Sequence, residues 1–390
     1  MTQSRKGEIL VIGAGASGIT SALAFQIEGY NVKIVTKELP FNTIQKSDFS
    51  SHYPAASIIP HSVNFPDILD LFTESAAIFE VLYQKDFTGI EKHKHFELFS
   101  DKQDLPNYSI CYPSFGLFAP FKDSSRPSHP TLESSFGWSF DCLFTDWGQY
   151  YPKLFELFKK LGGEIIQGKI NSETLLDLDT EIIINCAEIY GATLLGEDFS
   201  PQIYRGHLLH IPGMPMLKNT EGQKISYNFT PDKSIYSTEL GAEQDVYFYQ
   251  RENRWIFGGS RQKGTIDING KWIGESVIDP SIQVGNILFP EQILKLNLDI
   301  IDHTFDKYDI ALDNIIPKIG YRFMGNSEER LRIDETEIGD KLIINNFGHG
   351  GSGVTLSWGC ALRCLNLLNK GLGVEAVDHV KFREKLLSVI

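Results

Sequence analysis

The 390-residue sequence lacks several features that would identify its class at once. It has no run of about eighteen apolar residues, so we expect no membrane-spanning helix. Its five cysteines form no pair of CxxC motifs and are odd in number, which predicts reduced thiols, a cytoplasmic location and no metal site. It has no long basic segment, and its formal net charge of −14 argues against a general nucleic-acid surface.

What is present is the composition of an ordinary globular protein, with 42% hydrophobic and 22% charged residues. A chain of this length can bury a large core and form two domains around a cleft. We find no internal repeat and no low-complexity tract. The parts of the chain are therefore expected to be interwoven within one compact unit.

The N-terminal residues have the pattern of a βαβ unit. Residues 8–12 form a short apolar run, 13–18 contain three glycines, 19–27 are rich in apolar residues, and 30–36 alternate in polarity. This order predicts a strand, a tight turn, a helix and a second strand. Because such a unit opens a doubly wound parallel sheet, the fold class is predicted to be α/β.

Later segments predict a return to this sheet around a second, largely antiparallel one. The expected elements are amphipathic helices over 68–82 and 146–161, strands over 164–170 and 181–185, aromatic and β-branched strands between about 202 and 265, and a strand, glycine turn and helix over 343–368. The strand-rich middle would form a substrate domain beside the sheet that begins at the N-terminus.

The glycine-rich turn has the spacing Gly13-x-Gly15-x-x-Gly18 between a strand and a helix. The first glycine allows the tight turn, the second lets the backbone approach a pyrophosphate, and the third lets helix and strand pack closely. The helix N-terminus adds N–H donors. We therefore predict a dinucleotide site at Gly13, Ala14, Gly15, Ala16, Ser17 and Gly18. The simpler interpretation is a tight turn that holds no ligand.

The acidic residue that usually binds the adenosine ribose is less clearly placed. It normally ends the second strand, and here that end is Thr36-Lys37-Glu38. Glu38 lies one or two positions late, and Lys37 could instead meet a phosphate. We assign Lys37 and Glu38 to the cofactor site, with a solvated strand end as the alternative.

A second glycine-rich loop, residues 348–353, follows a predicted strand and precedes a predicted helix. It contains four glycines, which indicates that backbone must approach another group closely. A helix beginning at Gly353 would direct its N-terminal dipole toward a flavin ring oxygen or a phosphate. An NAD-linked dehydrogenase would share the first turn but gives no reason for this loop.

Several motifs together make the sequence resemble the D-amino acid oxidase and D-aspartate oxidase family. They occur in the family's order from end to end of the chain, and they are Val11-Ile12-Gly13-Ala14-Gly15, Ala55-Ala56-Ser57-Ile58-Ile59-Pro60-His61, Val246-Tyr247-Phe248-Tyr249, Gly258-Gly259-Ser260-Arg261-Gln262-Lys263-Gly264, Gly320-Tyr321-Arg322, Gly348-His349-Gly350-Gly351-Ser352-Gly353-Val354-Thr355, and Trp358-Gly359-Cys360-Ala361-Leu362. The resemblance implies an FAD-dependent oxidoreductase that deaminates a D-amino acid, with dioxygen as acceptor and hydrogen peroxide as a product.

The resemblance also implies roles for individual residues. Arg322 would grip the substrate α-carboxylate, Tyr247 would bind the same group, and the Gly351 carbonyl would accept a hydrogen bond from the substrate amine. Further FAD contacts would come from Ala55, Ala56, Ser57, Ile170, Gly348, Gly350, Gly351, Gly353, Val354 and Thr355. The FAD-binding domain would comprise 1–60, 145–200 and 318–390, and the substrate domain 61–144 and 201–317. An amino acid is the expected partner, and a homodimer is left open.

Some positions depart from the family's pattern. Glu243 stands where its oxidases often have a second tyrosine, Leu240 stands where its aspartate oxidases have an arginine, and Glu188 replaces a glycine. Arg261 and His61 could still offer positive charge to a side-chain acid, or else serve only local structure. These departures leave open an oxidase or dehydrogenase for glycine, an N-alkyl or cyclic amino acid, or a specialised biosynthetic intermediate, and also a silent flavin-binding protein.

Overall fold

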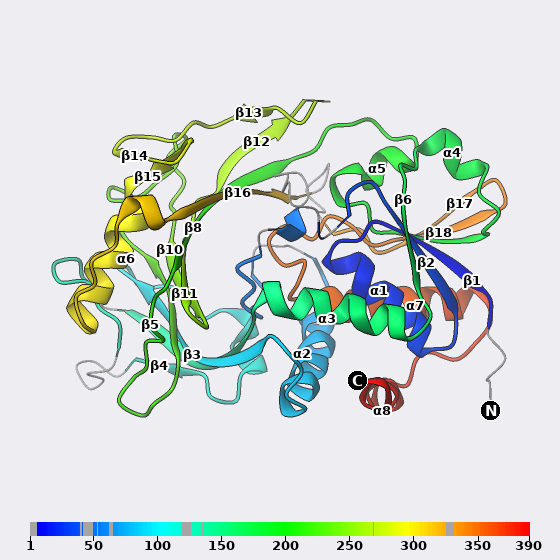
Figure 1. Ribbon diagram of the computed structural model, residues 1–390, viewed down its shortest axis with the longest axis horizontal. Helices are drawn as coiled ribbons and strands as arrows, with labels where there is room; N and C mark the ends of the chain where they lie inside the picture. The colour runs from blue at the N-terminus through cyan, green and yellow to red at the C-terminus, as the bar shows by residue number, and fades with distance from the viewer. Residues whose placement is uncertain are drawn as a thin grey trace.

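Two β-sheets, one in each half of the molecule, organise the fold (Figure 1). The computed structural model describes residues 6–39, 41, 50–52, 54–61, 65–118, 126–134, 136–267, 269–324 and 331–390. None of the helices within these residues is both long and apolar enough to cross a membrane.

The first sheet has six strands in the order β17-β18-β7-β1-β2-β6. They are β1 (Glu8–Ile12), β2 (Asn31–Thr36), β6 (Glu164–Gln167), β7 (Ile182–Asn185), β17 (Glu335–Ile338) and β18 (Lys341–Asn345). Only the pairing of β17 with β18 is antiparallel. Ile9 and Val11 of the central strand are fully buried, since a parallel strand is covered on both faces. The predicted α/β class is thereby confirmed.

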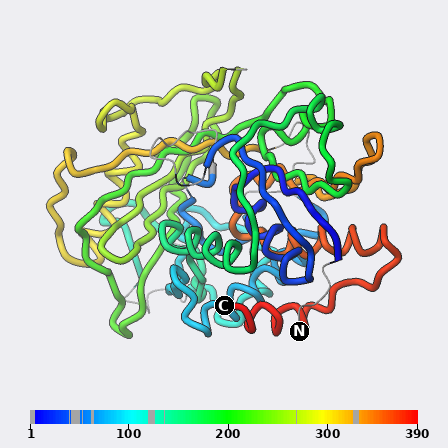
Figure 2. The backbone as a smooth tube through the Cα atoms, turned by 45° about the vertical axis from the view of Figure 1, so that its right-hand side comes forward, coloured from blue at the N-terminus to red at the C-terminus, as the bar shows by residue number. Residues whose placement is uncertain are grey.

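Helices from distant parts of the sequence pack against this sheet and one another. The central pair is α1 (Ala16–Ile27) with α7 (Ser357–Gly371), and the others are α2 (Ile68–Gln84), α3 (Trp147–Lys160) and α8 (His379–Val389). Two short helices, α4 (Ser172–Leu176) and α5 (Gly191–Leu194), lie between strands of the sheet in the sequence. Figure 2 shows the orange and red C-terminal segments in the same half as the blue N-terminal unit. The two ends of the chain therefore build one core.

The second sheet has ten strands and is largely antiparallel. Nine follow the order β13-β12-β8-β11-β10-β9-β3-β5-β4, and β16 also pairs with β8. Their bounds are β3 (Ile90–Phe99), β4 (Gly116–Leu117), β5 (Phe136–Thr145), β8 (Ile203–Pro212), β9 (Ile225–Thr230), β10 (Val246–Arg251), β11 (Arg254–Gly258), β12 (Gln262–Ile266), β13 (Trp272–Gly274) and β16 (Ile316–Phe323). Within the described residues, the remaining elements are a hairpin, one helix that contacts β10 and β11, and four short 3-10 helices: β14 (Ser281–Val284), β15 (Ile287–Pro290), α6 (Glu291–Thr304), η1 (Ser50–His52), η2 (Asn107–Cys111), η3 (Glu188–Tyr190) and η4 (Leu312–Asn314).

Three expected boundaries need correction. Strand β6 ends at Gln167 instead of residue 170. Helix α7 begins at Ser357 and not at Gly353; residues 353–356 form a turn, and the Leu356 N–H donates to the Ser352 carbonyl at 2.9 Å. A domain boundary at residue 318 would cut β16, whose whole length pairs with β8 in the ten-stranded sheet. The strand that carries Arg322 thus goes with the second sheet, while the rest of the proposed domain division stays a prediction.

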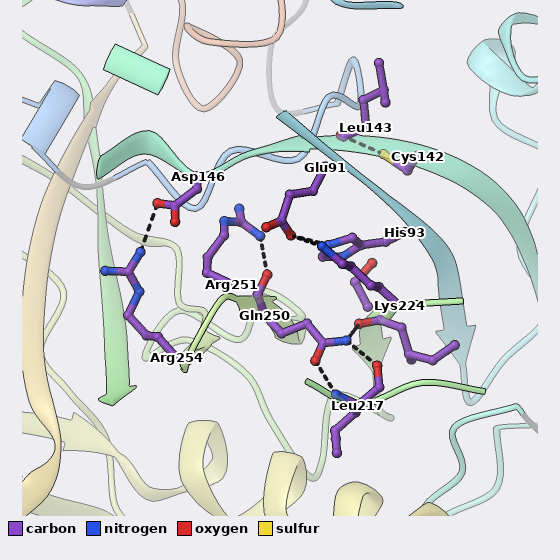
Figure 3. A network of polar contacts seen from close by, with 12 residues as sticks. Glu91, His93, Cys142, Leu143, Asp146, Leu217, Lys224, Gln250, Arg251 and Arg254 are labelled. Carbon is purple, nitrogen blue, oxygen red and sulfur yellow. Dashed lines mark hydrogen bonds and ion pairs between the residues drawn. The ribbon is translucent and has the colours of Figure 1, made fainter. Parts of the chain in front are cut away.

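A buried polar network holds β10 to its surroundings (Figure 3). The Gln250 amide donates to the carbonyls of Leu217 at 2.6 Å and Ile225 at 2.7 Å. Burial would raise the pKa of Glu91, but His93, Lys224 and Arg251 together lower it to about 2. Arg251, which is 1% exposed, donates to the Ala55 carbonyl. The network therefore fixes the backbone of one of the predicted cofactor segments.

Two histidines on β8, the buried His207 and the half-buried His210, predict a loss of stability in acid. Desolvation, aided by nearby cationic groups, lowers the pKa of His207 and of His210 to about 3. Each folded pKa lies below the unfolded value of about 6.5, so unfolding takes up protons as the pH falls from there toward 3. We expect His210→Gln to reduce the dependence of the unfolding free energy on pH by about 1.4 kcal/mol per pH unit in this range.

Chemical denaturation of the wild type and His210→Gln at several pH values between neutrality and the acid limit of folding measures this slope. His379→Gln is the matched control, because His379 lies on the surface helix α8 and is paired with Glu74. Equal slopes for the wild type and His210→Gln would contradict the assignment of a neutral His210 in the folded protein.

Candidate active site

The glycine-rich turn between β1 and α1 packs too tightly for side chains at two of its positions. Gly13 has φ +105°, and a Cβ there would lie 2.4 Å from the Cys186 carbonyl oxygen. A Cβ at Gly18 would lie 2.0 Å from the Gly13 carbonyl oxygen. The Ala16 N–H at the start of α1 donates to the Ser51 hydroxyl at 2.9 Å. Backbone and a polar hydroxyl thus face each other at a helix N-terminus.

A cavity of about 410 Å³ extends from this turn to the end of β2. Its wall includes the predicted residues Gly13, Ala14, Gly15, Lys37, Glu38 and Ile170. The Lys37 ammonium lies 4.8 Å from the centre of the Tyr190 ring, which also lines the cavity. The Thr36 hydroxyl donates to the Glu38 carbonyl at 2.9 Å, which holds the strand end in a turn.

A second cavity, of about 150 Å³, lies against the ten-stranded sheet. The two cavities adjoin each other, because Ser51 lines both of them. In addition, Gly15 lines the first cavity and the next residue, Ala16, lines the second. The other predicted residues in its wall are Ala55, Ala56, Ser57, His61, Tyr247, Arg261, Arg322, Gly350, Gly351, Gly353, Val354 and Thr355. Segments that are far apart in the sequence, from the first quarter and from the second half, therefore meet around this cavity.

Arg322 on β16 and Tyr247 on β10 belong to the same sheet, and both line the second cavity. The Arg322 guanidinium donates through Nη1 to the Ser260 carbonyl at 2.8 Å and lies over Gly206, where a Cβ would come within 2.6 Å of it. The Tyr247 ring covers Gly258 and Gly259 in the same way. Burial raises the pKa of Tyr247 although Arg322 opposes the shift, so its hydroxyl remains a hydrogen-bond donor at neutral pH. Two donors thus converge on one space.

Arg261 and His61 lie in the same wall but differ in charge. Desolvation and Arg322 lower the pKa of Arg261 to about 10, so it is protonated at neutral pH, and it forms an ion pair with Asp245. Desolvation lowers the pKa of His61 to about 4 against the opposing effect of Glu97. His61 therefore presents a neutral imidazole near pH 7, which favours the alternative that it serves local structure over the alternative that it offers positive charge.

Glu188, the residue that replaces a glycine of the family pattern, holds the second glycine-rich loop. Its φ is +46°, and its carboxylate accepts from the Gly348 N–H at 3.0 Å and contacts the His349 imidazole. Burial would lower the pKa of His349, but Glu188 and Cys360 raise it to about 10. The Thr355 hydroxyl donates to the Ser57 carbonyl at 2.9 Å. An ion pair and this bond therefore tie the loop to two other segments of the site.

A family model described as "DAO: FAD dependent oxidoreductase" matches residues 8–365. The chain belongs to this family. Among curated relatives, the D-amino-acid oxidase of Dictyostelium discoideum is 27% identical over 373 residues, covering 94% of this chain and 93% of the relative. The L-amino acid deaminase of Proteus vulgaris has a similar structure, with a TM-score of 0.63, 14% identity and coverage of 98% and 97% of the two chains. Glycine oxidase of Bacillus cereus also has a similar structure, with a TM-score of 0.61, 14% identity and coverage of 95% of this chain and 99% of the other.

The residues of this FAD-dependent oxidoreductase fit the cofactor of its family. A dinucleotide requires close backbone approach at a helix N-terminus and a long space beyond it. The turn at Gly13 supplies the first, and the two cavities that share Ser51 supply the second. The predicted FAD dependence is therefore confirmed by the family and is compatible with the site.

Three predicted contact residues do not line either cavity in the described part of the chain. Ser17 and Gly18 are buried inside α1, and Gly348 donates its N–H to Glu188. Their contribution is to pack the turn and the loop. Sequence reasoning missed Ser51 and Asp245, which line the cavities. Their positions close to the Ala55 motif and directly before Val246 were the available signals.

Proposed function

We propose that this oxidoreductase deaminates a D-amino acid to the corresponding 2-oxo acid. The observation that carries the proposal is the convergence of Arg322 and Tyr247 on a cavity that adjoins the glycine-lined cofactor cavity. A guanidinium and a neutral phenol are suited to bind one carboxylate. The D-amino-acid oxidase relative supports the choice of substrate. The five cysteines, which are all unpaired, support a cytoplasmic location.

In this proposal the protein positions the substrate for oxidation at its α-carbon. The Arg322 fork and the Tyr247 hydroxyl bind the α-carboxylate, and the Gly351 carbonyl accepts a hydrogen bond from the amine. When bound, FAD would supply the acceptor for the α-hydrogen as hydride, with dioxygen as the final electron acceptor and hydrogen peroxide as its product. Water hydrolyses the released imino acid to the 2-oxo acid and ammonia. The chain's contribution is orientation and electrostatics.

The cofactor contacts follow from the walls of the two cavities. Gly13, Ala14 and Gly15 would face the pyrophosphate beside Ser51, and Lys37 and Glu38 would face the adenosine end. Ala55, Ala56, Ser57 and the loop from Gly350 to Thr355 would surround the flavin end. The Ala16 N–H donates to the Ser51 hydroxyl, which therefore lies beside the helix N-terminus and could donate its own hydrogen to the pyrophosphate there.

Anaerobic mixing of the FAD-loaded protein with a substrate panel tests the function. The panel contains D-amino acids, their L-enantiomers, glycine, sarcosine and proline, and the measurement is the loss of the visible flavin absorbance. Reduction by D-amino acids, followed by release of 2-oxo acid, ammonia and peroxide on admission of air, is expected. Reduction by only sarcosine, glycine or proline would support the related amine oxidase instead, and a stable yellow protein reduced by none would indicate a silent flavoprotein.

A further inference from the structure

The second cavity contains an ion pair that has no place in the mechanism above. It joins Arg261, which precedes β12, to Asp245, which precedes β10. Asp245 is 8% exposed, and the backbone N–H of Arg261 donates to the side-chain carbonyl of Gln244 at 2.7 Å. Both partners are therefore held by the sheet beside the substrate space, and their charges offset each other before any substrate enters.

Charge balance in this wall limits the side chain that a substrate can carry. The described lining residues that are charged near neutral pH are Arg322, Arg261 and Asp245. If Arg322 binds the α-carboxylate, the remaining pair has no net charge. The buried Glu97 adds negative charge near Arg261. A second substrate carboxylate would therefore meet a cation that is already paired and two nearby acids, an unfavourable arrangement of charges although the Arg261 side chain is 38% exposed.

The same pair is complementary to a neutral polar group. A guanidinium only donates hydrogen bonds, and a carboxylate only accepts them. A carboxamide offers a carbonyl to Arg261 and an amide N–H to Asp245, so it satisfies both without separating them. A purely apolar side chain would satisfy neither.

Resting on the function proposed above, we propose that the preferred substrate is a D-amino acid whose neutral side chain both donates and accepts hydrogen bonds, as a carboxamide does. Asp245 is the residue that excludes a side-chain carboxylate, because it occupies Arg261. Selectivity is thus achieved by a repulsive group as much as by an attractive one.

Isosteric substrates give the test. The dependence of the anaerobic flavin-reduction rate on substrate concentration gives kcat/KM for the reductive half-reaction. It is compared for D-asparagine against D-aspartate and for D-glutamine against D-glutamate. The wild-type protein is expected to favour the amide of each pair. Asp245→Asn frees Arg261 and is expected to raise kcat/KM for the acidic partner by about 10- to 100-fold, the range typical of a hydrogen bond to a charged group.

Two further variants isolate the effect. Glu252→Gln removes the same charge at an exposed position in the turn after β10 and is expected to leave the amide-to-acid ratio unchanged. Adding Arg261→Gln to Asp245→Asn is expected to remove the gain for the acid. The visible flavin spectrum reports whether each variant is folded and loaded.

The ratio of kcat/KM for the amide to kcat/KM for the acid in the wild-type protein tests the inference even if Asp245→Asn does not fold. Faster reduction by D-aspartate than by D-asparagine would overturn the inference while leaving the proposed function intact. An unchanged ratio in a well-folded Asp245→Asn would do the same. Absence of reduction by every D-amino acid would instead remove the proposed function, and the inference with it.

Discussion

Replacement of Arg322 by leucine is expected to lower kcat/KM for the D-amino acid by about 10²- to 10³-fold or more. Removing one partner of a buried, hydrogen-bonded charge pair costs about 3–5 kcal/mol, and each 1.4 kcal/mol is about tenfold. The guanidinium is held by the Ser260 carbonyl and lies over Gly206, and the other arginine of the wall, Arg261, is already paired with Asp245. Rapid-mixing measurements of flavin reduction give the rate and the apparent affinity separately.

Two variants separate loss of carboxylate binding from general damage. Arg322→Lys keeps the positive charge but not the planar fork, so we expect it to recover only part of the loss. Arg363→Leu removes an arginine from the surface of α7, where it pairs with Asp67, and should not change the kinetics. If Arg322→Leu reduces flavin as fast as the wild type at the same substrate concentrations, Arg322 does not bind the carboxylate.

Sequence patterns predicted the N-terminal βαβ unit and the helix α3 well, because the signals for these elements are local. The apolar run 8–12, the glycine spacing and the alternating run up to Thr36 correspond to β1, the turn into α1, and β2. The helix expected over 146–161 begins at Trp147 because Asp146 caps it, accepting from the Gly148 N–H at 3.2 Å. Each of these features depends on residues within a few positions of one another.

Other features depend on contacts that are distant in the sequence, and they could not be predicted. Arg322 belongs to the second sheet because β16 pairs with β8, more than a hundred residues earlier. The charge of Arg261 is offset by Asp245, and that of Glu188 by His349. The neutral state of His61 arises from desolvation in the folded wall. Family motifs named most residues of the site but not their partners, which only the fold brings together.

Substitution of Gly18 by alanine is expected to destabilise the protein by about 3 kcal/mol or more, the upper end of the cost of overpacking. The added Cβ would lie 2.0 Å from the Gly13 carbonyl oxygen and 2.9 Å from its carbon, and backbone atoms cannot move aside as a flexible side chain can. Helix α1 must therefore shift away from the turn. Because the turn at Gly13 lines the cofactor cavity, the dissociation constant for FAD should rise as well.

Gly371→Ala is the matched control for Gly18→Ala. Both glycines lie in helices, but a Cβ at Gly371 would meet no atom within 4 Å. Alanine is favoured over glycine in a helix by up to about 1 kcal/mol, so Gly371→Ala should leave stability unchanged or raise it slightly. Denaturant unfolding of the apo-proteins and FAD titration followed by flavin fluorescence give both quantities. Equal stability and equal FAD affinity in the two variants would show that close packing at the turn is not what holds the cofactor site together.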